Sequence, residues 1–76
     1  MDSRITINPE ICHGKPVITG TRVLVSNILS ALAAGQSIEE VLEDYPNIKK
    51  EDVFSALAFG SQLSKFESLP YDKLAS

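Results

Sequence analysis

The sequence predicts a mainly α-helical protein with a short N-terminal β arm or hairpin, whose body is a tri-helical bundle of the helix-turn-helix type. Three observations predict this fold. Apolar residues recur at helical spacing in three successive segments after residue 24. Short β-branched pieces, interrupted by glycine and proline, precede them. The 76 residues suffice for one small domain, which we place at residues 1–67.

The arm, residues 1–24, begins with a strand in which apolar and polar residues alternate. Such a short strand needs a partner, because an isolated hairpin is marginal in water. That partner is either the β-branched pieces at 17–18 and 23–25 or the arm of a second copy. We expect pairing across a homodimer, since a free strand edge accepts another strand. The candidate dimer contacts are Ile5, Ile7, Val17 and Ile18.

The segment 14–22 predicts a specified corner in the arm. Gly14 and Gly20 allow the backbone to turn there, because glycine adopts positive φ at little cost. We expect the hydroxyl of Thr21 to stabilise the second turn. Arg22 has two interpretations: a structural arginine that binds carbonyls or a carboxylate, or a contact to a phosphate.

Helices are predicted near residues 25–35, 37–45 and 49–67, with 68–76 as a C-terminal tail. Gly35 ends the first helix, and Ser37 opens the second with Glu40 at capping-box spacing. In the third helix, Phe54 and Ala58 widen the apolar surface beyond one stripe, which indicates contacts on two sides. Gly60 either permits close packing against another helix or lets the helix bend.

A chain of this size is marginally stable alone and usually needs additional stabilisation. The single Cys12 excludes an internal disulfide, and with the single His13 it cannot form a metal cluster, so we expect no cofactor and favour oligomerisation. No apolar run approaches the roughly 18 residues of a membrane span, and the first residues lack an apolar segment, so we expect a cytoplasmic protein without membrane contact.

The helix-turn-helix pattern favours DNA binding, with the third helix in the major groove. The candidate contacts to double-stranded DNA are Lys49, Lys50, Ser55 and Arg22. Against this, residues 36–76 have four basic and eight acidic side chains, whereas nucleic-acid binders normally show a basic stripe. The alternative interpretation of Lys49 and Lys50 is that they are only solvated surface charges. The acidic cluster of the second helix is a solvated face or a surface for a basic partner protein (Glu39, Glu40, Glu43 and Asp44).

We expect no enzymatic activity. No pair of titratable groups is placed for acid–base chemistry, and no base stands beside the hydroxyls of Thr19 and Thr21. Cys12 and His13 are adjacent in sequence, an arrangement in which the two side chains rarely face each other productively.

The motifs Gly14-Lys-Pro-Val-Ile-Thr-Gly-Thr-Arg22, Leu32-Ala-Ala-Gly35, Tyr45-Pro46 and Glu51-Asp-Val-Phe-Ser-Ala-Leu57 resemble the small bacterial proteins grouped as domain of unknown function 433. The resemblance covers roughly residues 5–66. It implies a homeodomain-like or winged-helix-like fold with a β arm, usually dimeric, and for some members an antitoxin role beside a PIN-type ribonuclease toxin. We therefore expect a dimeric, DNA-binding, antitoxin-like transcriptional regulator of a type II toxin–antitoxin pair. The alternative is a non-catalytic protein-interaction module that does not bind nucleic acid.

Overall fold

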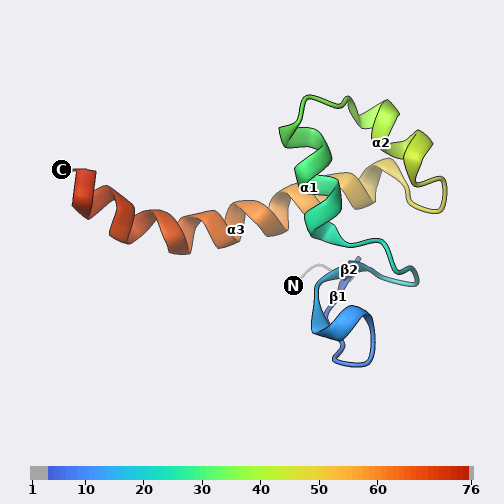
Figure 1. Cartoon of the computed structure of the whole chain (residues 1–76), viewed down its shortest axis with the longest axis horizontal. Helices are drawn as coiled ribbons and strands as arrows, with labels where there is room; N and C mark the ends of the chain where they lie inside the picture. Colours follow the sequence, from blue (N-terminus) through green and yellow to red (C-terminus); the bar gives the residue numbers. More distant parts are fainter. Residues whose placement is uncertain (1–3, 76) are drawn as a thin grey trace.

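The structure, a computed structural model, describes residues 4–75, with side chains for residues 4–63. Three helices follow a small N-terminal hairpin: α1 (Val25–Ala33), α2 (Ile38–Asp44) and α3 (Lys50–Ala75). Figure 1 shows α1, α2 and the hairpin gathered around the first half of α3. This mainly helical arrangement confirms the predicted fold class.

The hairpin pairs within its own chain. Strand β1 (Ile5–Thr6) lies antiparallel to β2 (Val17–Ile18), with Ile5 opposite Ile18, and Leu24 forms a bridge to Val17. Between the strands, a 3-10 turn (Cys12–Gly14) reverses the chain. Of the two partners that the sequence left open, the structure shows the intramolecular one.

The predicted corner is confirmed in detail. Gly14 and Gly20 have φ of +80° and +82°, the conformation for which glycine was expected. The Thr21 hydroxyl donates to the carbonyl of Ile18 at 2.8 Å and accepts from the amide of Val23 at 3.0 Å. These two bonds fix the turn that leads from β2 into α1.

Both ends of the α1–α2 link are capped by local hydrogen bonds. The amides of Gly35 and Gln36 donate back to the carbonyls of Leu32 and Ala31, which is the Schellman arrangement at a helix C-terminus. Ser37 then forms the predicted capping box: its hydroxyl accepts from the Glu40 amide, and the Glu40 carboxylate accepts from the Ser37 amide.

One apolar core joins the hairpin to the three helices, because β1, β2, α1, α2 and α3 all contribute buried residues to it. Gly60 lies against α1: a Cβ on it would come within 2.9 Å of Leu29 Cδ1. Gly60 therefore permits close helix packing. The buried apolar cluster consists of Ile5, Ile18, Val23, Val25, Ile28, Val41, Ile48, Val53 and Ala56.

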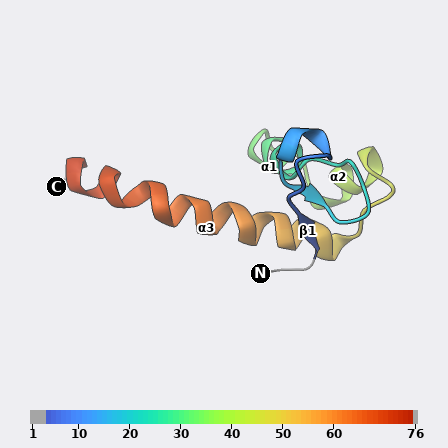
Figure 2. The ribbon, with the colours of Figure 1, turned by 90° about the horizontal axis from the view of Figure 1, so that it is seen from below.

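Helix α3 is longer than predicted. Its backbone continues to Ala75, through the residues 68–75 that the sequence assigns to a tail. The helix continues through Pro70, although a proline inside a helix removes one backbone hydrogen bond and crowds the carbonyl four residues before it. Figures 1 and 2 show this second half of α3 extending away from the other elements. The domain boundary at residue 67 stays a prediction.

Candidate interaction surface

The surface with the most functional interest is at the start of α3, which is set in place by the preceding turn and by Asp52. In the turn, the Ile48 amide donates to the Tyr45 carbonyl at 3.1 Å, and the Ile48 side chain is buried. The Asp52 carboxylate accepts from the Lys49 amide at 2.8 Å and from Arg4 Nη1 at 3.1 Å. The first turn of α3 is thereby fixed both to the preceding turn and to the N-terminal arm.

The cap at Lys49 is a feature that sequence analysis missed. The lysine side chain has no hydrogen-bond acceptor, so Lys49 cannot cap the first amides of α3 with its side chain. Asp52 stands three residues after Lys49, and its carboxylate accepts from the Lys49 amide, which is the reciprocal half of a capping box. The spacing between the two residues is that of a capping box, a signal that was present in the sequence.

The side of α3 that faces away from the core is apolar in its first turns. Phe54 is 49% exposed and Leu57 is 42% exposed, and Ala58 beside them is also exposed. Lys50 Nζ lies 5.9 Å from the centroid of the Phe54 ring, close enough for a cation–π contact. We call Lys50, Phe54, Leu57, Ala58 and Ser61 the outward face of α3; all are exposed, at spacings of three and four residues.

The four predicted DNA contacts differ in exposure and in position. Lys49 and Lys50 are exposed at the start of α3, as expected. Ser55 does not face outward: it is 6% exposed and lies one helical turn after the buried Asp52. It is therefore unavailable to a phosphate or a base edge.

Arg22 lies in the turn between β2 and α1, away from the α2–α3 junction in the chain. It is exposed, and within residues 4–63 its guanidinium makes no hydrogen bond or ion pair, so the structure does not show the first of its two interpretations, a structural arginine. Its carbonyl accepts a weak contact from the Cys12 thiol at 3.9 Å. A phosphate contact by Arg22 stays a prediction.

Three of the four candidate dimer contacts are inside the subunit. Ile5, Val17 and Ile18 are between 1% and 6% exposed, because the intramolecular pairing of β1 and β2 places them in the core. They are not available to a second copy. Ile7 is 53% exposed and is the one member of this set that stands on the surface.

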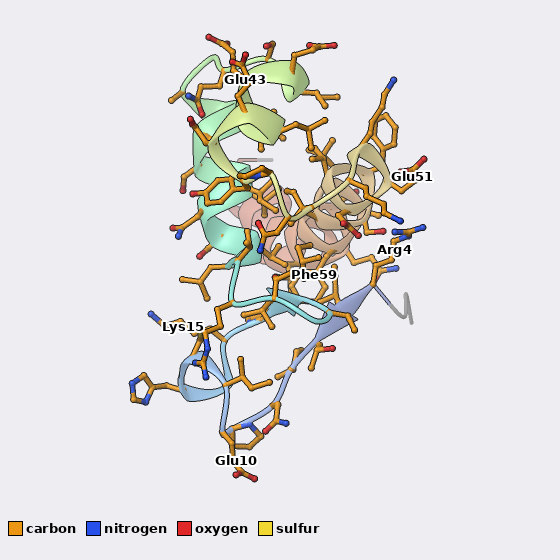
Figure 3. All side chains as sticks on the ribbon, turned by 90° about the vertical axis from the view of Figure 1, so that its right-hand side faces the viewer. Arg4, Glu10, Lys15, Glu43, Glu51 and Phe59 are labelled. Carbon is orange, nitrogen blue, oxygen red and sulfur yellow. The ribbon has the colours of Figure 1, made fainter. Side chains whose placement is uncertain are left out.

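The acidic side chains of α2 are exposed, and Figure 3 shows Glu43 pointing away from the body. Asp44 accepts from Gln36 Nε2 at 3.3 Å. Glu10 and Lys15, both on the arm, lie on the opposite side of the body from Glu43 in Figure 3. In the part of the chain that the structure describes, no group of three or more His, Cys, Asp or Glu is arranged to hold a metal ion.

A sequence model of one family, described as protein of unknown function (DUF433), matches residues 5–60. The chain belongs to this family. The match covers the hairpin, all three helices up to Gly60 and the whole outward face except Ser61, so the surface lies within the part of the fold that the DUF433 family shares.

The chain is also similar to two individual proteins. It is similar to a DUF433 member protein from Anabaena variabilis, whose crystal structure superposes with a TM-score of 0.76 at 29% identity, over 82% of this chain and 61% of that one. It is 41% identical over 49 residues to the uncharacterized protein y4eO of Sinorhizobium fredii, over 64% of this chain. The match spans 22% of y4eO and 61% of the Anabaena protein, so both relatives are considerably longer than the part they share with this chain.

In the described residues, no helix combines the length and the hydropathy that crossing a membrane requires.

Proposed function

We propose that this protein is a non-catalytic module that acts by binding another protein through the outward face of α3. The observation that carries the proposal is the half-exposure of Phe54 and Leu57 on one side of a well-anchored helix. An aromatic and an aliphatic side chain that remain exposed together are typical of protein–protein contact sites. The firm anchoring of the helix supports the same conclusion, because a preorganised surface loses little entropy on binding.

The second candidate is a DNA-binding, antitoxin-like transcriptional regulator that acts as a dimer in a type II toxin–antitoxin pair, with a PIN-type ribonuclease as its partner. The exposure of Lys49 and Lys50 at the start of a helix that follows a short helix and a turn favours it. Phosphate contacts at a helix N-terminus are common.

The outward face of α3 weighs against the groove-binding part of this second candidate. A recognition helix presents polar side chains to base edges, whereas Phe54 and Leu57 occupy that position here. The exposed acidic side chains of α2, the helix that would brace the phosphate backbone, also oppose DNA electrostatically. An antitoxin role needs a protein contact as well, so the first proposal is compatible with it.

The experiment compares Phe54→Asp with Lys49→Glu, which changes a charge beside the outward face without touching it. Each tagged variant is expressed in the organism that encodes the protein, and any stoichiometric partner is purified and titrated against each variant by calorimetry. We expect a partner that binds wild type and Lys49→Glu with equal affinity and loses at least tenfold with Phe54→Asp. Equal binding of Phe54→Asp would contradict the proposal.

DNA binding is tested separately by fluorescence anisotropy with mixed-sequence duplex DNA at low salt. If the second candidate is correct, wild type binds and log K falls with log[salt] by about 0.9 per phosphate contacted. The double variant Lys49→Glu, Lys50→Glu would then weaken binding and flatten that slope. We expect no binding at tens of micromolar protein, which would remove the DNA-binding candidate.

A further inference from the structure

Two basic side chains on the turns of the arm have no partner within the subunit. Lys15 and Arg22 are both exposed, and within residues 4–63 neither side chain makes a hydrogen bond or an ion pair. Arg4, on the first strand, differs from them, because it pairs with the buried Asp52. The charges of Lys15 and Arg22 therefore remain available to an anion from outside the subunit.

Backbone contacts bring these two cations to the same place, although they are seven residues apart in the sequence. The Cys12 thiol contacts the carbonyl of Arg22 at 3.9 Å, and the amide of Lys15 donates to the carbonyl of Cys12 at 3.2 Å. Cys12 thus joins the turn that carries Lys15 to the turn that carries Arg22. The exposed His13 follows Cys12 and adds a ring N–H donor. We call His13, Lys15 and Arg22 the basic patch.

The basic patch lies in a part of the chain that has no acidic side chains. Residues 11–38 contain no aspartate and no glutamate, so Lys15 and Arg22 meet no opposing charge there. Figure 3 shows Lys15 on the opposite side of the body from Glu43, and it shows Glu10 at the far end of the arm. Although the net charge of the chain is −3, this side of it is therefore positive.

The backbone that carries the patch is held by hydrogen bonds and by burial. Directly after Lys15, the carbonyl of Pro16 accepts from the amide of Val25 at 3.0 Å. Arg22 stands between Thr21, whose hydroxyl fixes the turn, and Val23, which is buried. An anchored backbone lowers the entropy that is lost on binding, so the patch is preorganised for a ligand.

We propose that the basic patch binds an acidic segment of another protein, whose carboxylates contact Arg22 and Lys15. The guanidinium of Arg22 can donate two parallel N–H bonds to one carboxylate, and the ammonium of Lys15 can neutralise a second one. The patch shares no residue with the outward face of α3. The inference therefore goes beyond the proposed function and adds a second binding surface.

The surroundings of the patch favour an acidic protein over a nucleic acid. Ile11, Pro16 and Leu24 belong to the same turns and are half-buried, so each leaves some apolar surface exposed. Apolar side chains of a protein segment can cover this surface while its carboxylates meet the cations. A phosphate backbone has no apolar side chains for this purpose. Two cations also give a nucleic acid little affinity, because DNA-binding proteins often contact about six to ten phosphates.

The test is an NMR titration of the full chain, at low salt, with a synthetic peptide of alternating glutamate and leucine. We expect the amide signals of residues 12–16 and 20–24 to move, while those of the outward face stay in place. The double variant Lys15→Gln, Arg22→Gln should weaken binding about tenfold, which corresponds to two exposed charge contacts. Arg22→Lys should restore part of the loss in the Arg22→Gln variant, because it keeps the charge without the fork.

The matched control is Lys49→Gln, which removes an exposed lysine outside the patch and should bind the peptide like wild type. Far-UV circular dichroism establishes that each variant is folded. If the double variant does not fold, Lys15→Gln alone should still give part of the loss. Signals that move only at the start of α3 overturn the proposal, as does an unchanged affinity in the patch variants.

Inorganic phosphate and a short mixed-sequence DNA duplex are titrated in the same buffer. Phosphate that moves the patch signals at the same concentration as the peptide overturns the proposal, because the patch then accepts any small anion. Tighter binding of the duplex at the patch overturns it in favour of a nucleic acid. Phe54→Asp should leave peptide binding unchanged. A protein partner that is lost with Phe54→Asp, in a chain that does not bind the peptide, leaves the proposed function standing without this inference.

Discussion

Arg4 and Asp52 form an ion pair across 48 residues of sequence, with Arg4 Nη1 3.1 Å from Asp52 Oδ1. The same carboxylate caps the start of α3 by accepting from the Lys49 amide. Asp52 is only 7% exposed, and its two partners account for this burial, because aspartate is seldom buried without partners. One side chain therefore holds together the first strand, the α2–α3 turn and the helix that carries the candidate surface.

Replacement of Asp52 by alanine should destabilise the protein by about 1–2 kcal/mol, because it removes the helix cap and leaves the Lys49 amide without its acceptor. Asp52→Asn should cost less, since its amide oxygen can still accept from Lys49. Urea unfolding monitored by circular dichroism gives both values. The control is Glu51→Ala, an exposed neighbour expected within about 0.5 kcal/mol of wild type. If Asp52→Ala matches that control, Asp52 does not anchor the helix.

Thr21→Val should destabilise the corner while preserving its shape. The hydroxyl makes two hydrogen bonds within the turn, and their loss should cost on the order of 1–2 kcal/mol. Thr19→Val is the matched comparison: the Thr19 hydroxyl contacts that of Thr6 at 2.8 Å in an exposed position, so its loss should cost less. Thermal unfolding ranks the two variants, and a larger loss for Thr19→Val would refute the assignment.

Gly60→Leu should destabilise by on the order of 1–3 kcal/mol, because its side chain would overlap the Leu29 side chain of α1. Leu29→Ala makes room for it, so the double variant should be more stable than the sum of the two single changes predicts. A double-mutant cycle from urea unfolding measures this coupling. Strict additivity would mean that residues 29 and 60 do not share a packing site.

His13 lies at φ +58°, in the left-handed region, directly after Cys12 at φ +50°. A β-branched residue tolerates this conformation poorly, so His13→Ile should cost about 1–2 kcal/mol, whereas His13→Asn should be neutral or stabilising. The matched control is Lys15→Ile, at φ −74°, where isoleucine fits the backbone. Equal stabilities for the two isoleucine variants, measured by urea unfolding, would contradict the strained turn.

Local patterns were sufficient to predict most of the fold. The capping box at Ser37, the turn at Thr21 and the three helices all depend on spacing within a few residues, and each is present. What local patterns could not settle was which of two partners a strand takes. The burial of Ile5 and Ile18 follows from pairing between segments thirteen residues apart, a tertiary outcome that periodicity does not encode.

The candidate site was predicted in part. Lys49 and Lys50 are exposed as expected, and the wide apolar surface at Phe54 was visible in the sequence. Ser55 was misplaced because a small polar residue gives no signal of burial; in the structure it lies on the side of α3 that carries the buried Asp52. The exposure of Leu57 also depends on how α3 turns against α1, which no helical spacing determines alone.

The partnership of the first strand with residues near position 52 has a consequence for synthesis on the ribosome. Ile5 shares its cluster with Val53 and Ala56, so the strand cannot reach its final surroundings until residue 56 has been translated. At about 5–20 residues per second, the nascent arm waits for several seconds without its neighbours. The arm should therefore fold only after the first turns of α3 have been synthesised.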